Sequence, residues 1–163
     1  MDSYIICMFH PHTKECDLAG KQAMMVYNAV MEYCERNNLK CYYFKSNNDP
    51  GYNKIVKCLD VDFTYDMSGE DFYRLLAGAH MIVGNSSCGI REASYLGIPS
   101  VNIGDRQRGR VKADNVVSCG FGEIHEAMGK AYDMRCEQSH LFGDGESVPR
   151  MIKIIKEEYC GKS

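Results

Sequence analysis

A short stretch that follows the apolar run 80–83 combines residue types suited to binding an anion. The segment 84–92, GNSSCGIRE, places two adjacent hydroxyls, Ser86 and Ser87, where an apolar strand gives way to a helix. Free N–H groups at a helix start and the helix dipole favour a phosphate there. The segment is neither a Walker loop nor a Gly-x-Gly-x-x-Gly turn. On local sequence alone, a diphosphate site and a helix start capped by Ser86 or Ser87 fit it equally well.

Glu92 adds a carboxylate about one turn into the same helix. With Ser87 as the N-cap, the third helical position is Ile90, so a capping box does not account for Glu92. A carboxylate beside a phosphate site can accept hydrogen bonds from both hydroxyls of a ribose. A phosphate and a ribose together indicate a nucleotide.

Polar residues also follow three other apolar runs, each within a few positions of its end. They are His10, Asn47 and Arg106. In an open parallel sheet, ligands bind outside the carboxyl ends of the strands, where helix N-termini point. We therefore expect these side chains to share one sheet edge with Ser86 and Ser87. A histidine directly after a strand is more often structural than catalytic, so the sequence around His10 alone does not assign it a role.

The segment 106–112, RQRGRVK, gathers basic residues in a chain whose formal net charge is −3. One interpretation is a set of arginine forks beside a diphosphate, and the other is a solvated charged loop. The net negative charge argues against nucleic-acid or acidic-membrane partners. The histidines show no ligand spacing, so we expect no metal site and no cofactor.

The elements that must position these residues alternate between short apolar runs and helical patterns, which indicates βαβ units around a parallel sheet. We expect strands at 4–9, 39–44, 61–65, 80–83, 99–103 and 115–117. We expect helices at 18–37, 51–58, 68–78 with Ser68 as its N-cap, 89–97, 122–136, and from Ser147 onwards. The last helix has Pro149 in its first turn and an apolar face expected to be buried: Val148, Met151, Ile152, Ile155 and Tyr159. The predicted fold is α/β, a Rossmann-like doubly wound parallel sheet forming a single domain over 1–163.

Nine cysteines raise the question of a disulfide scaffold or a metal centre. Their number is odd, no Cys-x-x-Cys occurs, and several lie in apolar periodic segments, so we expect reduced, mostly buried thiols. Cys88 is the exception for which a position at a helix start could lower the pKa. The N-terminus lacks the pattern of a signal peptide, and no apolar run approaches the ~20 residues that span a bilayer, so we expect a cytoplasmic protein.

Three segments closely resemble the hydrolysing UDP-N-acetylglucosamine 2-epimerases, which include bacterial sialic-acid-pathway enzymes. They are 83–110, ADNVV (113–117) and FGDGESVPRMIKIIK (142–156). The opening YIICMFHPHT and the turn SNNDPG are similar to the family's strand-plus-His-Pro and Asn-x-Asp turns, so the resemblance spans nearly the whole chain. It implies the second half of a glycosyltransferase-B-type fold, in which two Rossmann-like domains enclose the substrate.

The resemblance also implies a set of residues that bind UDP or UDP-N-acetylglucosamine. Ser86 and Ser87 would hold the diphosphate, and Glu92 would accept the ribose hydroxyls. Arg106 and Asn47 would line the nucleotide site.

Two further contacts are implied at the ends of this ligand. The backbone near Met67 would touch the uracil, and His10 would face the reacting sugar as a catalytic residue. The family's reaction eliminates UDP to give 2-acetamidoglucal and then adds water to give N-acetylmannosamine. This chemistry needs a base for the C2 proton and groups that stabilise the leaving diphosphate.

The sequence departs from the family mainly in one respect: it does not include the family's first domain. The family's proton-transferring carboxylates and arginine belong largely to a first domain, whereas this sequence starts at the second domain's first strand. We expect UDP binding with little or no epimerisation by this chain alone, as an excised domain or as one partner of a split enzyme. A separately made first domain would complete the cleft, and the exposed interdomain face favours a partner chain or homo-association. Two alternatives stay open: the nucleotide-binding subunit of a two-part glycosyltransferase, and a non-catalytic UDP-sugar-binding module.

Overall fold

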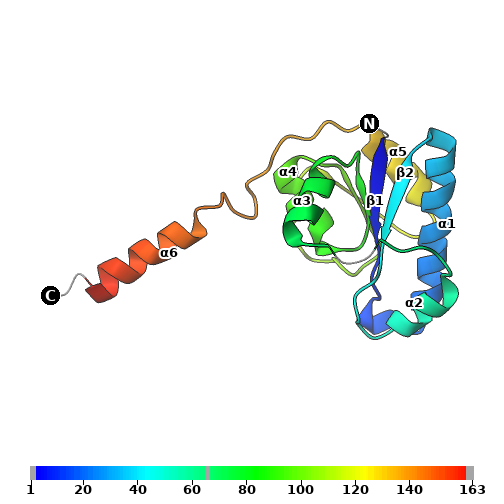
Figure 1. Cartoon of the computed structure of the whole chain (residues 1–163), viewed down its shortest axis with the longest axis horizontal. Helices are drawn as coiled ribbons and strands as arrows, with labels where there is room; N and C mark the ends of the chain where they lie inside the picture. Colours follow the sequence, from blue (N-terminus) through cyan, green and yellow to red (C-terminus); the bar gives the residue numbers. More distant parts are fainter. Residues whose placement is uncertain (1–2, 65–66, 161–163) are drawn as a thin grey trace.

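A computed structural model describes residues 3–64 and 67–160, and it has one parallel sheet covered by helices on both faces (Figure 1). The sheet is five-stranded in the order β2-β1-β3-β4-β5. Every neighbouring pair of strands is parallel. The chain adds β2 on one side of β1 and then β3, β4 and β5 on the other, so the sheet is doubly wound, as predicted.

The strands are short, and each overlaps an apolar run predicted to form a strand. They are β1 (Tyr4–Met8), β2 (Lys40–Phe44), β3 (Ile82–Gly84), β4 (Ser100–Ile103) and β5 (Val116–Cys119). The strand expected at 61–65 is reduced to an isolated bridge between Phe44 and Thr64. The last position of that expected strand, Tyr65, lies outside the described residues.

Helices flank the sheet in two groups. On one face lie α1 (Ala19–Asn37), α2 (Tyr52–Cys58) and α5 (Ile124–Asp133), and on the other lie α3 (Gly69–Ala77) and α4 (Glu92–Leu96). The predicted start of α3 is confirmed, because the Ser68 hydroxyl accepts a hydrogen bond from the Asp71 N–H at 3.1 Å. None of the helices within the described ranges is both long and apolar enough to cross a membrane.

Successive residues of β1 point to opposite faces of the sheet and supply two apolar clusters. Ile5 and Cys7 belong to the cluster under α1 and α5. Ile6 packs in the other cluster with Leu76 of α3 and Ala93 of α4. Because helices cover both faces, the strand is buried along its length and reads in the sequence as a continuous apolar run.

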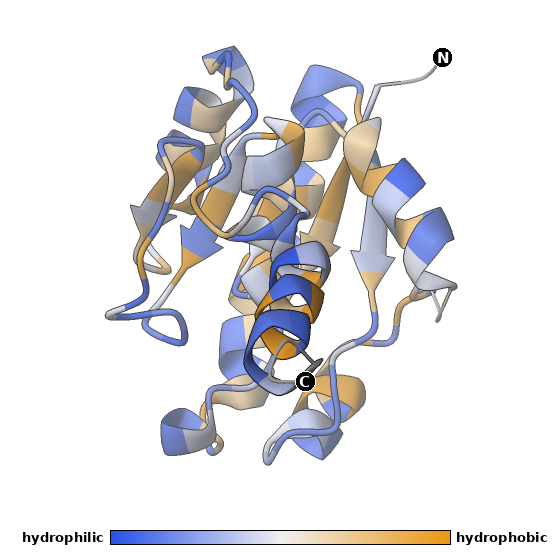
Figure 2. Cartoon of the chain, turned by 90° about the vertical axis from the view of Figure 1, so that its left-hand side faces the viewer, coloured by the Kyte–Doolittle hydropathy of each residue, from blue (hydrophilic) through white to orange (hydrophobic). Residues whose placement is uncertain are grey.

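The final helix, α6 (Ser147–Ile155), corrects one expectation. It forms as predicted, but it extends away from the sheet and its flanking helices (Figure 1). Apolar and polar residues lie on different sides of this helix (Figure 2). The apolar residues expected to be buried are 47% to 82% exposed: Val148, Met151, Ile152, Ile155 and Tyr159. The helical periodicity was therefore correct, and the burial of its apolar face within this chain was wrong.

The cysteines whose side chains are described are free thiols, as expected. The expectation that most of them are buried is wrong: Cys7, Cys34 and Cys88 are buried, whereas Cys58 is exposed and the other four are partly exposed. Burial raises the pKa of the Cys88 thiol to about 11, against a smaller lowering by its hydrogen bond to Ser86. The prediction of a lowered pKa for Cys88 is wrong, because desolvation of the thiolate outweighs the position at the start of a short helical turn.

β3 ends at Gly84, where the backbone of β1 passes very close. Gly84 has φ of 140°, and a Cβ at this position would lie 2.0 Å from the Met8 carbonyl oxygen. Backbone cannot yield as a flexible side chain can, so the contact requires glycine. This close approach brings the residue after β3 beside the residues that follow β1.

We expect Gly84→Ala to lower the free energy of unfolding by about 3 kcal/mol, because the new methyl group collides with the main chain of β1. Gly129→Ala is the matched control, since Gly129 lies in α5 and a Cβ there meets nothing within 4 Å. It should raise stability by roughly 0.5–1 kcal/mol through helix propensity. Urea denaturation followed by circular dichroism measures both, and wild-type stability for Gly84→Ala would contradict the close approach.

Candidate functional site

The candidate site lies at the carboxyl edge of the sheet, where the winding reverses direction between β1 and β3. Ligands of open α/β sheets bind at this switch point. β1 leads into His10, β2 into Asn47 and Asp49, β3 into Asn85, and β4 into Arg106. The expectation that His10, Asn47 and Arg106 share one edge is therefore met by the strand order.

A closed circuit of hydrogen bonds joins these strand ends. The His10 N–H donates to Asn85 Oδ1 at 2.7 Å, and Asn85 Nδ2 donates to the His10 carbonyl at 2.8 Å. The Asn47 N–H donates to His10 Nδ1 at 3.1 Å, and Asn47 Nδ2 donates to Asp49 Oδ2 at 2.7 Å. Arg106 closes the circuit through Nη2 to Asp49 Oδ2 and Nη1 to the Asn85 carbonyl, both at 3.2 Å. We call His10, Asn47, Asp49, Asn85 and Arg106 the strand-end ring.

Ser86 and Ser87 follow the ring directly, at a short 3-10 turn, η2 (Ser87–Gly89). The Ser86 hydroxyl oxygen accepts a bond from the Cys88 N–H at 3.5 Å and another from Cys88 Sγ at 3.1 Å. Ser86 therefore caps the turn, as the structural interpretation of this segment predicted. Its own O–H remains a donor, so capping and anion binding are compatible.

Within the described residues, no hydrogen bond joins the side chain of Glu92 or of Met67 to the strand-end ring. Glu92 is the first residue of α4, is exposed, and lines a cavity of about 580 Å³ with Tyr73 of α3 and part of the segment 139–148. Met67 packs against the apolar cluster that contains Ile6. The hydrogen bonds of the described residues thus join His10, Asn47 and Arg106, and they include neither Glu92 nor Met67.

Two residues that organise the site escaped the sequence-based prediction. Asn85 and Gln107 are buried, and Gln107 Nε2 donates to the Asn85 carbonyl at 2.8 Å. A signal for Asn85 was present, because it follows its strand as closely as His10 follows β1. Gln107 offered none, since it stands among charged residues and reads as part of an exposed loop.

His10 is buried, and its electrostatic surroundings keep its ring neutral. Burial is the largest cause that lowers the His10 pKa, to about 4, and the Arg106 charge lowers it further. Asp49 acts in the opposite direction and is outweighed. The imidazole is therefore uncharged at neutral pH, although a cation and a carboxylate both face it.

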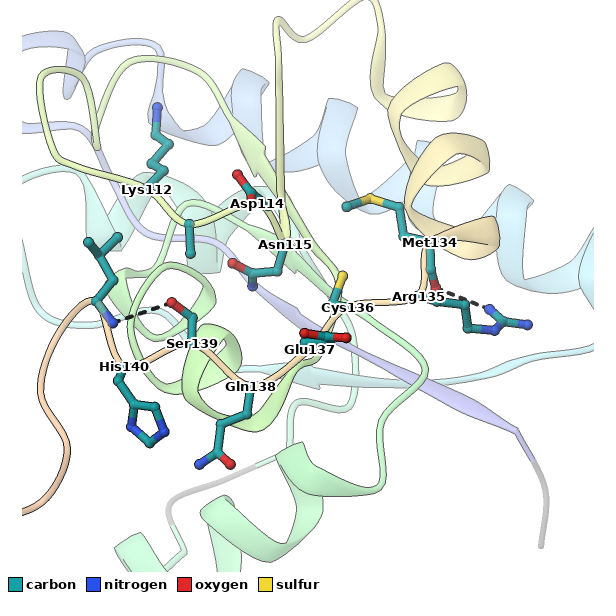
Figure 3. A pocket seen from close by; sticks show the side chains of 12 residues that line it. Lys112, Asp114, Asn115, Met134, Arg135, Cys136, Glu137, Gln138, Ser139 and His140 are labelled. Atoms are coloured by element: carbon teal, nitrogen blue, oxygen red, sulfur yellow. Dashed lines mark hydrogen bonds between the residues drawn. The ribbon is translucent and has the colours of Figure 1, made fainter.

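A second cavity, of about 800 Å³, lies between the segments 112–115 and 134–141 (Figure 3). It borders the start of β5 and the chain that follows α5, and it mixes both signs of charge, such as Lys112 and Glu137. None of the predicted site residues lines it. Across the described part of the chain, no group of three or more His, Cys, Asp or Glu residues is arranged to hold a metal ion.

The family model of UDP-N-acetylglucosamine 2-epimerase matches residues 1–156. The chain belongs to this family. A UDP-N-acetylglucosamine 2-epimerase from Neisseria meningitidis is 31% identical over 167 residues, covering 94% of this chain and 43% of that protein. The hydrolyzing UDP-N,N'-diacetylbacillosamine 2-epimerase of Legionella pneumophila is 28% identical over 166 residues, covering 93% of this chain and 42% of the relative. The family thus includes hydrolysing members, as the resemblance implied.

Solved structures show the same fold. The Methanocaldococcus jannaschii UDP-GlcNAc 2-epimerase, determined in complex with UDP-GlcNAc and UDP, aligns with a TM-score of 0.75 at 17% identity. The alignment covers 96% of this chain and 46% of that one. The predicted fold class is confirmed: a Rossmann-like half of a glycosyltransferase-B-type epimerase fold. The chain spans less than half the length of the relatives that it matches.

Because the His10 pKa is lowered by folding, the free energy of unfolding should fall as the pH falls. Its pKa is about 4 in the folded chain against an ordinary value of 6.5, so the unfolded chain takes up this proton first. Stability is therefore present above pH 6.5 and is lost as the pH falls towards 4. We expect His10 to account for a loss of about 2 kcal/mol between pH 7.5 and pH 5. Urea denaturation at both pH values measures it. A His10→Gln variant that kept the whole pH dependence would contradict this assignment.

Proposed function

We propose that this chain is the UDP-binding half of a hydrolysing UDP-N-acetylglucosamine 2-epimerase. The supporting observation is the strand-end ring, which lies at the switch point of this family's fold immediately beside Ser86 and Ser87. The overall reaction is UDP-N-acetylglucosamine plus water to N-acetylmannosamine plus UDP, through 2-acetamidoglucal.

In this proposal, the diphosphate lies between the turn 86–89 and the Arg106 guanidinium. Arg106 directs one N–H each to Asp49 and to the Asn85 carbonyl, and within the described residues its other N–H donors have no hydrogen-bond partner, so they can bind phosphate oxygens. Ser86 and Ser87 add hydroxyl donors. Together these groups stabilise the negative charge that grows on the diphosphate as it leaves the sugar.

The remaining contacts follow the length of the ligand. Glu92 accepts hydrogen bonds from the two ribose hydroxyls, Asn47 lines the nucleotide site, and the backbone near Met67 contacts the uracil. His10 faces the sugar. The elimination step moves the C2–H electron pair into a C1=C2 bond while the C1–O bond to the diphosphate breaks. In this proposal the base that takes the C2 proton belongs to the half of the family's fold that this chain does not span, so the chain alone has little or no epimerase activity.

Calorimetric titration with UDP tests the nucleotide site. We expect the full chain to bind UDP and Glu92→Ala to lose about 1–3 kcal/mol of binding free energy, because the ribose hydroxyls lose their acceptor. Glu126→Ala is the matched control, since Glu126 is an exposed helical glutamate of α5. Equal affinity in wild type and Glu92→Ala would remove Glu92 from the site.

An activity assay with UDP-N-acetylglucosamine separates the remaining alternatives. Robust release of N-acetylmannosamine by the purified chain would contradict the half-enzyme assignment. Transfer of the sugar to an acceptor without 2-acetamidoglucal would instead favour a subunit of a two-part glycosyltransferase. UDP binding with no turnover even when a first half is supplied would favour a non-catalytic binding module.

We further propose that the exposed apolar face of α6 packs against the remaining half of the family's fold, on the same polypeptide or on another. The family match runs to residue 156, through the whole of α6, while the chain covers only 43% of its Neisseria meningitidis relative. A helix of nine residues is marginal in water without tertiary packing. A contiguous apolar face that is exposed on one side of a helix marks an interaction surface.

If α6 packs on another half, substitutions in its apolar face should not change the free energy of unfolding of this domain. We expect Ile152→Asp to change the free energy of unfolding by less than about 0.5 kcal/mol, because α6 buries none of its residues. Ile55→Asp, at a buried position of α2, should cost more than about 3 kcal/mol. Urea denaturation measures both.

Two results would contradict the proposed role of α6. A loss of stability in Ile152→Asp comparable to that in Ile55→Asp would show that the helix packs on this chain's own core. A stable dimer of the full chain that Ile152→Asp dissociates, measured by light scattering, would show that a second copy covers the apolar face instead.

A further inference from the structure

Asn85 uses every polar group it has to hold neighbouring strand ends. The residue is 2% exposed. Its N–H donates to the Met8 carbonyl at 3.2 Å, and its carbonyl accepts from Arg106 and Gln107. Its side chain forms the two bonds to the His10 backbone described above, at 2.7 and 2.8 Å. A buried amide held by hydrogen bonds at its nitrogen and at its oxygen is restrained, and removing it leaves its partners unpaired.

The two side-chain bonds extend the β1–β3 pairing beyond its last backbone pair. That pair is Met8 with Gly84. Asn85 lies one residue past Gly84, and His10 lies two residues past Met8. There the Asn85 side chain takes the place of a partner strand's backbone: it accepts from the His10 N–H and donates to the His10 carbonyl. The main chain of His10 is thereby fixed, and with it the direction in which the imidazole leaves the backbone.

The position of the His10 ring decides which nitrogen carries its proton. His10 Nδ1 lies 3.1 Å from the Asn47 N–H, which donates to it. A ring nitrogen that accepts a hydrogen bond carries no proton, so a neutral imidazole in this position is protonated on Nε2. Nε2 is then a hydrogen-bond donor, and the basic lone pair of the ring is already engaged by Asn47.

We propose that Asn85 is the positioning residue of this site: its paired hydrogen bonds to the His10 backbone hold the imidazole with Nδ1 on the Asn47 N–H and the proton on Nε2. His10 therefore offers a bound ligand a neutral hydrogen-bond donor rather than a base. The identity of that ligand rests on the proposed function, in which the donor meets an oxygen of the UDP-sugar. The base that removes the C2 proton is then a residue other than His10.

The charges around His10 agree with this assignment. Arg106 and Asp49 face the ring from the segments after β4 and β2. Burial and Arg106 together lower the His10 pKa more than Asp49 raises it, so the ring stays neutral and keeps one proton to donate. Asn85 also helps to position the cation, because its backbone carbonyl accepts the Arg106 bond.

Nuclear magnetic resonance of the full chain, labelled with ¹⁵N-histidine, tests the proposal without any ligand. Long-range ¹H–¹⁵N spectra report which ring nitrogen is protonated, and a pH titration reports the pKa. In wild type we expect the Nε2–H form and a His10 pKa near 4. In Asn85→Ala we expect the pKa to rise towards 6.5 and the single tautomer to be lost, because the backbone of His10 is released.

Two further variants complete the design. Asn85→Asp keeps an acceptor for the His10 N–H and loses the donor to the His10 carbonyl, so it should give a partial loss of the single tautomer. Its carboxylate also raises the His10 pKa by charge alone, so this variant is judged by the tautomer. Asn102→Ala is the matched control: Asn102 is a buried asparagine in β4, and it bonds neither His10 nor Arg106 in the described part of the chain. It should leave the tautomer and the pKa of His10 unchanged.

Either of two results would overturn the proposal. One is a wild-type His10 protonated on Nδ1, a result that needs no variant. The other is a folded Asn85→Ala with the wild-type tautomer and pKa. If Asn85→Ala does not fold, an Asn85→Asp variant that keeps the wild-type tautomer overturns the proposal instead. A separate UDP titration of wild type distinguishes the two proposals. Absence of UDP binding would count against the proposed function, while the tautomer result would still stand or fall on the spectra.

Discussion

The candidate site depends on one pair of hydrogen bonds, in which the side chain of Asn85 bridges to the backbone of His10. Parallel strands that end inside a covered sheet leave backbone N–H and carbonyl groups without a ladder partner, and burying such groups unpaired is costly. Asn85 satisfies both groups at the end of β1. Gly84 makes this possible, because only a residue without a Cβ lets the end of β3 lie against Met8.

The other contacts of the strand-end ring are individually weak. The ion pair between Arg106 and Asp49 is partly exposed, so its direct contribution to stability is small. Its role is geometric, because it anchors the loop after β4 to the loop after β2. The cation and the carboxylate also oppose each other at His10, which leaves burial as the main cause of the neutral ring.

The described chain has two outward-facing features at different places. The strand-end ring opens at the carboxyl edge of the sheet, and the apolar face of α6 extends away from the body (Figure 1). The chain spans less than half the length of the relatives that it matches, and the proposed function assigns both surfaces to contacts that complete the family's fold and its substrate site. In the proposed half-enzyme, one feature binds the part of the substrate that leaves, and the other provides attachment to the half that carries the base.

The sequence by itself determined most of the elements, since buried parallel strands read as apolar runs, although the strand expected at 61–65 forms only an isolated bridge. It also placed His10, Asn47 and Arg106 after strands. The alternation of apolar runs and helical patterns predicted the doubly wound sheet, and the family resemblance supplied the glycosyltransferase-B-type fold and the expected ligand. Only the tertiary structure decided that these side chains form a ring, that Asn85 holds it, and that α6 buries nothing in this chain. The physical reason is distance along the chain. His10 bonds to residues 75 and 37 positions away, and local patterns carry no information about which strand ends meet. The apolar spacing of an amphipathic helix is the same whether its apolar face packs on its own domain or on another surface.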